Sequence, residues 1–261
     1  MTGLRDTYLF DESRRDEQHR CLAAALDPVS TGRLAATGVA DGWHCLDVGC
    51  GSGSLARWLA QRVAPTGCVV ATDVAPVPVS DSANLSVVEH DIRTDPLEGG
   101  AFDLVVVRML LQHLPERDAL VAKLGRALKP GGWLQVDELD ASYEPVLLAP
   151  DARSAELCEK FLRAKRDAMC AAGGDPEWGR SAAASLRAAG FVDVDPQPHV
   201  GSRNPGSPDL ELQENHTHHL RDALVAAGMT DEELAQVRAA MRDPSFRSSS
   251  GIVYSVQGRK P

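Results

Sequence analysis

The sequence contains no long hydrophobic run and no block of basic residues. None of its apolar stretches approaches the ~18 residues that a membrane-spanning helix needs. Lysine and arginine are scattered singly or in pairs, and the formal net charge of the 261-residue chain is −10. Because such a surface repels nucleic acid, we expect neither a nucleic-acid nor a membrane partner. The polar N-terminus is also unlike a secretory signal.

Cysteine motifs are missing as well. The six cysteines show neither a C-x-x-C pair nor the spacing of a zinc site. We therefore expect them to be small buried side chains in a protein of the reducing cytoplasm, and we expect no metal site.

The chain does contain alternating strand and helix patterns. Short apolar or β-branched runs, followed in places by helical stripes, predict five strands at 44–49, 68–73, 85–91, 102–107 and 133–139. Short connections between them predict a parallel sheet covered on both faces, an α/β fold. The segment after Asp73 has no helical stripe, so that crossover helix is expected to be short or missing.

Helices dominate outside these strands. Residues 1–42 read as a helical N-terminal lid interrupted by a turn at 27–30, and 43–261 as the core domain. Within that core we expect helical insertions at about 151–175 and 205–245. The individual elements after residue 150 are predicted as helices at 151–171, 181–189, 209–227 and 231–242 and strands at 191–196 and 251–258.

A glycine loop follows the first predicted strand. Residues 45–60 read CLDVGCGSGSLARWLA, in which Asp47 precedes Gly49, Gly51 and Gly53 and a helix follows. Glycine permits positive φ and lets a ligand approach the backbone closely. The third glycine comes one place too early for a dinucleotide fingerprint, and a carboxylate at Asp47 would repel a pyrophosphate. The loop better suits a ligand that carries an ammonium and a sulfonium.

Two further strands end in acidic residues. Asp73 closes the second strand, where a carboxylate can accept both hydroxyls of a ribose or simply cap a turn. Asp91 and Ile92 follow the third strand. Asp91 could accept from an exocyclic amine while Ile92 packs on an aromatic ring, and the alternative is a plain Asx turn.

These motifs resemble those of the class I S-adenosylmethionine-dependent methyltransferases, over most of the chain. CLDVGCGSG is similar to the first motif of that family, and FDLVVVRMLLQHLPE and LKPGGWL are similar to motifs around its fourth and fifth strands. YLFD, DPVS and VQGRKP resemble an actinobacterial, ubiquinone-biosynthesis-like branch that serves small-molecule pathways. The resemblance implies a Rossmann-like, doubly wound, mostly parallel seven-stranded sheet with an antiparallel last strand.

The resemblance also implies site roles. Gly49 and Gly51 would line the methionine part of S-adenosylmethionine, with Asp47 holding its ammonium. Asp73 would bind the ribose and Asp91 the adenine amine, with Ile92 against the ring. Arg108 would meet the carboxylate. The chain has no D/N-P-P-Y/F after the fourth strand, which argues against methylation of a planar amino group such as that of adenine.

Histidines are the candidate bases. His113 follows the fourth strand and could deprotonate an acceptor, or it could serve only to start a helix. On a helix at 209–227, His216 would share one face with apolar residues and His219 would lie at its edge, facing either a substrate or a helix seam. Tyr8 and Phe10 are predicted either to wall the substrate cavity or to pack.

Several functions remain open. The leading hypothesis is methyl transfer to a small molecule, in the setting of a natural-product pathway. The alternative is a protein that binds S-adenosylmethionine and catalyses a cyclisation or elimination without methylation. An NAD-dependent reductase and a ligand sensor on the same fold are disfavoured by the glycine spacing and the retained acids. The expected partner is the small-molecule substrate, and a homodimer is allowed.

Overall fold

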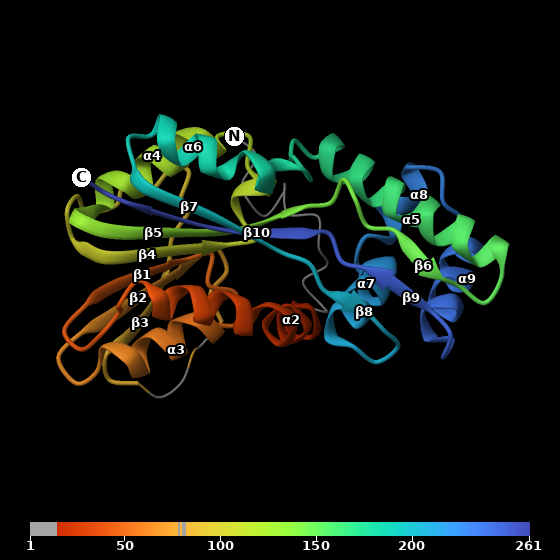
Figure 1. Ribbon diagram of the computed structural model, residues 1–261, viewed down its shortest axis with the longest axis horizontal. Helices are drawn as coiled ribbons and strands as arrows, with labels where there is room; N and C mark the ends of the chain where they lie inside the picture. Colours follow the sequence, from red (N-terminus) through yellow and green to blue (C-terminus); the bar gives the residue numbers. More distant parts are fainter. Residues whose placement is uncertain (1–14, 78, 80–81) are drawn as a thin grey trace.

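A twisted sheet with helices on both faces forms one half of the molecule, and a helical lobe with a small sheet forms the other (Figure 1). The structure is a computed structural model that describes residues 15–261 apart from 78, 80 and 81. Within these residues no helix is long and apolar enough to cross a membrane.

The main sheet has seven strands in the order β3-β2-β1-β4-β5-β10-β7. The first five are parallel, and β10 runs antiparallel to both of its neighbours. This confirms the predicted fold class. The strands are β1 His44–Val48, β2 Cys68–Asp73, β3 Leu85–Glu89, β4 Phe102–Arg108, β5 Leu128–Asp140, β7 Val192–His199 and β10 Ile252–Arg259.

Two layers of helices enclose the sheet (Figure 1). On one face, α4 (Arg117–Ala127) and α6 (Ala182–Ala188) bury leucines such as Leu124 and Leu186 against the central strands. On the other face, α3 (Ser54–Val63) and α2 (Arg15–Ala36) form a second core. Because both faces are covered, the central strands read as nearly continuous apolar runs. No helix is found among the described residues between β2 and β3, as the missing stripe predicted.

The helical lobe lies beyond the carboxyl ends of the parallel strands (Figure 1). Its apolar core joins Phe161, Leu234 and Phe246. Thr230 and Glu233 form the capping box that opens its last helix. The lobe comprises α5 Ala152–Ala171, α7 Pro208–His219, α8 Arg221–Ala226, α9 Asp231–Arg242 and the short strands β6 Val146–Leu148, β8 Ser202–Arg203 and β9 Arg247–Ser249. Single turns of 3-10 helix occur at η2 Leu111–His113 and η3 Trp178–Ser181.

The sequence prediction was wrong at 27–30, where no turn interrupts the N-terminal helix. α2 continues through Pro28, which is exposed. Contacts on the buried side hold the helix together there: the amide of Gln135 donates to the Ser30 carbonyl over 3.1 Å, and Leu34 is fully buried. Tertiary contacts thus outweigh the local helix-breaking tendency of proline.

Two other boundaries also differ. The helix expected over 209–227 is divided at Leu220, which leaves helical geometry at φ −100° and ψ 13°. The division redirects the chain so that Leu224 joins the core of the lobe. Strand pairing of β5 begins at Leu128 rather than at 133, because Leu128 already pairs with Phe102 of β4, and the KPGG segment forms an irregularity before pairing resumes at Trp133.

Replacing Pro28 by alanine should stabilise the protein. Alanine restores an amide N–H inside α2 and removes the clash of the ring with the preceding turn. A small part of this gain is offset by greater freedom of the unfolded chain. We expect the free energy of unfolding in urea to rise by about 1–2 kcal/mol. Pro115→Ala is the control, because Pro115 is exposed but lies in the turn before α4. Unchanged or lower stability of the Pro28 variant would contradict this account.

Candidate cofactor and substrate site

The glycine loop connects β1 to α3 and has the positive φ that the sequence requires. Gly49, Gly51 and Gly53 have φ of 69°, 53° and 72°. A Cβ at Gly49 would lie 2.8 Å from the side chain of Leu110, and one at Gly53 would lie 2.5 Å from Val79. A side chain at any of these positions would therefore be strained, and glycine lets the loop adopt this conformation.

Asp47 is the buried acid beneath this loop. Its side chain lies at the end of β1 and is 3% exposed. Its Oδ2 atom has no hydrogen-bond partner within the part of the chain that the structure describes. Burial raises the pKa of Asp47 to about 7, against the opposing effect of Arg108. An unsatisfied buried carboxylate oxygen fits a cationic ligand group such as the ammonium of S-adenosylmethionine.

Asp73 ties the glycine loop to the end of β2. Its Oδ2 accepts the backbone N–H of Gly51 over 3.0 Å, and its Oδ1 accepts that of Ala75 over 3.0 Å. Each carboxylate oxygen has a further lone pair, so these bonds leave room for hydroxyl donors. Binding of the ribose by Asp73 stays a prediction.

Asp91 forms the Asx turn that was the alternative interpretation. Its Oδ1 accepts the backbone N–H of Arg93 over 3.0 Å, and the guanidinium of Arg93 lies 2.9 Å from Oδ2. The hydrogen bonds from Arg93 lower the pKa of Asp91. Ile92 is 3% exposed. The proposed contacts of Asp91 and Ile92 with adenine stay predictions, in competition with Arg93.

Arg108 at the end of β4 is engaged by α2 and α3. Its guanidinium lies 2.8 Å from the carboxylate of Asp27 and donates to the hydroxyls of Ser54 and Ser30 over 3.2 and 3.3 Å. The side chain is 13% exposed. A cofactor carboxylate would have to share or replace Asp27, so this role of Arg108 also stays a prediction.

Glu138 fixes the segment that follows β4, a role the sequence did not reveal. Its fully buried carboxylate accepts the backbone N–H groups of Leu110, Leu111 and Gln112 over 3.0, 2.7 and 3.3 Å. Met109, just before them, has a left-handed φ of 52°. Burial raises the pKa of Glu138 to about 8 in spite of these bonds. In the sequence, Glu138 belongs to a cluster of acids with Asp137 and Asp140 at the end of the fifth predicted strand.

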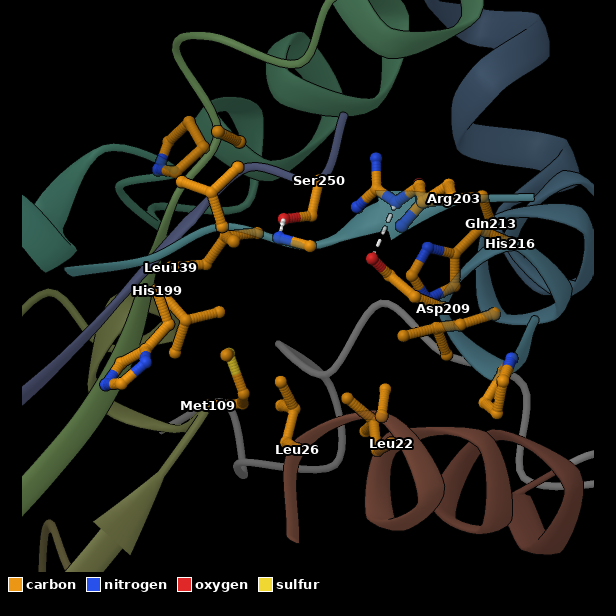
Figure 2. Close-up of a pocket in the computed structure, with 18 of the residues that line it drawn as sticks. Leu22, Leu26, Met109, Leu139, His199, Arg203, Asp209, Gln213, His216 and Ser250 are labelled. Atoms are coloured by element: carbon orange, nitrogen blue, oxygen red, sulfur yellow. Dashed lines mark hydrogen bonds and ion pairs between the residues drawn. The ribbon is translucent and has the colours of Figure 1, made fainter. Parts of the chain in front are cut away.

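A cavity of about 670 Å³ lies between the sheet and the helical lobe. Its walls come from α2, the segment after β4, the end of β5, α5, the β7–β8 connection and α7. Figure 2 shows Met109 and Leu26 on one side and His216, Gln213 and Arg203 on the other. Tyr8 and Phe10, predicted to line a cavity, lie outside the described residues.

Both candidate bases line this cavity. His113 and His216 are among its lining residues, whereas His219 is buried and is not. Burial and the neighbouring Arg117 lower the pKa of His113 to about 4. Burial, followed by the charge of Lys165, holds the pKa of His216 well below its ordinary value. Both rings are therefore neutral near pH 7 and can accept a proton or a hydrogen bond.

Charged residues on α5 and β8 also line the cavity, and no sequence motif indicated them. Lys165 and Arg203 come from segments 38 positions apart, which only the tertiary fold brings together. All six cysteines are free, but the expected burial was wrong for Cys170, which is exposed. Within the described residues no group of His, Cys, Asp and Glu side chains is arranged to hold a metal ion.

Asp47→Asn should stabilise the ligand-free protein at high pH. The pKa of Asp47 is about 7 in the fold and ~3.9 when unfolded, so its charged form is disfavoured in the fold. The folded state holds the extra proton between these values, and stability falls as pH rises through this window. We expect urea unfolding to show a gain of about 2–3 kcal/mol for the variant at pH 8 and little difference near pH 4. An equal difference at both pH values would contradict the assignment.

Comparisons with known proteins agree with this geometry. Residues 46–136 match the methyltransferase domain family. The chain is 30% identical to methyltransferase str2 of Strobilurus tenacellus over 152 residues, which are 55% of this chain and 51% of the relative. It is 33% identical to a ubiquinone/menaquinone biosynthesis C-methyltransferase of Cupriavidus necator over 129 residues, covering 46% of this chain and 53% of the relative. The chain thus spans about half the length of these curated relatives.

The fold recurs in solved structures. Phosphoethanolamine N-methyltransferase 2 of Haemonchus contortus, in complex with phosphomonomethylethanolamine and S-adenosylhomocysteine, aligns with a TM-score of 0.62 at 14% identity. The alignment covers 100% of this chain and 61% of that one. The sheet order and the acidic residue below a three-glycine loop agree with that match, so the chain is similar over about half of its length to class I methyltransferases that use S-adenosylmethionine.

Proposed function

We propose that the chain transfers the methyl group of S-adenosylmethionine to a small molecule held in the 670 Å³ cavity. The observation that carries this proposal is the position of the cavity, which reaches Met109 and His113 at the carboxyl edge of the sheet. Ligands of open α/β sheets bind outside these strand ends. When bound, the cofactor supplies an electrophilic methyl group on its sulfonium, and the protein supplies alignment.

The residues at the glycine loop would hold the cofactor. Asp47 would face the ammonium, the backbone of Gly49, Gly51 and Gly53 would line the methionine part, and Asp73 would accept the ribose hydroxyls. Asp91 and Ile92 would flank the adenine, and Arg108 would meet the carboxylate. The support is the positive φ of the three glycines together with the unsatisfied Oδ2 of Asp47.

Three lid segments would shield the reaction from water, namely residues 1–42, 151–175 and 205–245. Among the described residues, α2, α5 and α7 contribute wall residues such as Leu22, Met169 and Leu212. α9 packs behind α5 and does not line the cavity. Exclusion of water from such a site strengthens the polar contacts that align the reactants.

His113 and His216 are the proposed bases. A hydroxyl or activated carbon acceptor must lose a proton as it gains a methyl group, and a neutral imidazole can take that proton. The neutral ring of His216, whose pKa is lowered by burial and by the charge of Lys165, would also anchor the substrate by a hydrogen bond. His219 is buried outside the cavity and would do so only after a shift of α7. We further propose a cytoplasmic location and no nucleic-acid partner, in line with the net charge of −10. A homodimer stays a prediction.

Asp73→Ala should weaken cofactor binding. The variant removes the acceptor that holds the Gly51 amide and, on this proposal, the ribose hydroxyls. We expect calorimetry to show micromolar S-adenosylhomocysteine affinity for the natural protein and a loss of about 2–3 kcal/mol for the variant. Asp103→Ala is the control, since Asp103 pairs with Lys129 near the start of β4. Binding of NADH instead of S-adenosylhomocysteine would refute the assignment.

Turnover in the presence of labelled S-adenosylmethionine and a metabolite extract tests the transfer itself. Methyl transfer releases one S-adenosylhomocysteine for each labelled product. A new product without that release would instead support the non-methylating cyclisation or elimination.

His216→Ala should then lower turnover roughly 10- to 100-fold while leaving cofactor affinity nearly unchanged. His218→Ala is the matched control, because His218 lies on the same helix but is exposed. Equal kinetics in the His216 variant and the natural protein would remove His216 from the reaction.

A further inference from the structure

The cavity is chemically divided. One side is apolar and includes Leu22 and Leu26 of α2 and Met109 after β4. On the opposite side in Figure 2 lie Arg203, Asp209 and Gln213. Lys165 and Arg166 of α5 also line it. A molecule that fills the cavity would therefore meet hydrocarbon at the end nearer the glycine loop and charge at the end formed by the lobe.

Arg203 is the centre of the charged end and is itself satisfied. It is 3% exposed. Its Nη1 lies 2.8 Å from Oε1 of Glu144, and its Nε lies 2.9 Å from Oδ2 of Asp209. Glu144 is buried behind the cavity wall. Two carboxylates thus flank one guanidinium, and Arg203 by itself has no charge left to offer a ligand.

Lys165 is less well compensated. Its side chain is 12% exposed, and its Nζ donates to Oε1 of Gln213 over 2.6 Å. Oε2 of Glu144 lies 3.8 Å away, and Glu144 already pairs with Arg203 at the shorter distance of 2.8 Å. Burial lowers the pKa of Lys165 against the attraction of Glu144. Glu144 stays ionised, because Lys165 and Arg203 together outweigh its burial and lower its pKa.

Counted over the described residues alone, this end of the cavity has one more basic than acidic side chain. Lys165, Arg166 and Arg203 are basic, and Glu144 and Asp209 are acidic. The guanidinium of Arg166 donates to the carbonyl of Ala141 over 3.3 Å and forms no ion pair with the two acids. The histidines His216 and His113 add no charge near pH 7, because their pKa values are lowered. Arg166 is half-buried and the side chain of Lys165 is 12% exposed, so the surplus charge is only partly solvated and an anion would stabilise it.

We propose that the substrate is an amphipathic acid, with an apolar body against α2 and Met109 and one carboxylate against Lys165. This inference rests on the proposed function, because it names the substrate class of the same cavity. A single carboxylate neutralises an excess of one positive charge, whereas a phosphate dianion would leave a net negative charge. The methyl acceptor then lies at the end of the molecule away from the carboxylate, toward Met109 and His113.

The first experiment compares matched probes on the full chain saturated with S-adenosylhomocysteine. Calorimetry is run with 6-phenylhexanoate, its primary amide, the corresponding amine and 5-phenylpentyl phosphate. We expect the acid to bind at least about tenfold more tightly than the amide, with the amine weakest. An amide that binds as well as the acid, or no binding by any probe, overturns the proposal. A phosphate that binds more tightly than the acid overturns the assignment to a carboxylate.

The second experiment changes the charge count. Lys165→Gln and Arg166→Gln each bring the cluster to two cations and two anions, so the ratio of acid to amide affinity should fall to about one in both. Lys165→Arg should keep the preference. Lys160→Gln is the matched control, because Lys160 lies on the same helix but pairs with Glu233 away from the cavity. Thermal unfolding verifies each fold, and Arg166→Gln decides the matter if Lys165→Gln does not fold.

An unchanged preference in the folded charge variants would overturn the proposal. Failure of the proposed function is distinguishable, since it would appear as loss of S-adenosylhomocysteine binding or as absence of methyl transfer. The acid preference is measured without turnover.

Discussion

Burial of carboxylates at the carboxyl edge of the main sheet is the constraint on which the site depends. Asp47, Asp137 and Glu138 are at most 3% exposed, so each must find donors inside the protein. Glu138 accepts three backbone N–H groups, and the amide of Gln135 donates to Asp137. One Asp47 oxygen has no such donor among the described residues. The need for donors therefore fixes the segment after β4, and it leaves one oxygen of Asp47 available to a cationic group.

The clamp of Glu138 also links the two halves of the site. By holding the N–H groups of Leu110 to Gln112, it fixes the segment that packs against the glycine loop on one side and lines the cavity on the other. Arg108, one residue before Met109, pairs with Asp27 and so secures α2 at the same edge. The glycine loop and the cavity wall thus share one rigid support, which on the proposed function would align an in-line displacement.

The sequence predicted the sheet and the glycine loop because these depend on local patterns. Strand runs, the stripe of α3 and the spacing after Asp47 are each contained in a few neighbouring residues. The continuation of α2 through Pro28, the division at Leu220 and the small β6-β9-β8 sheet depend on contacts between distant segments. So does the pairing of Glu144 with Arg203, 59 positions apart. No periodicity in the sequence encodes such a pair, and for this reason the charged end of the cavity was missed.

The stability of the fold does not explain the charged end of the cavity. Elsewhere the lobe is held by apolar contacts such as those of Phe161 and Leu234, and well-packed hydrophobic groups commonly stabilise a core as well as buried ions do. Burying Arg203, Glu144 and most of Lys165 carries a desolvation cost that their mutual pairing offsets only in part. The cluster lies where α5, α7 and β8 meet the cavity. We attribute the cluster to ligand recognition, because an anionic ligand would neutralise the positive charge that the described residues leave unpaired.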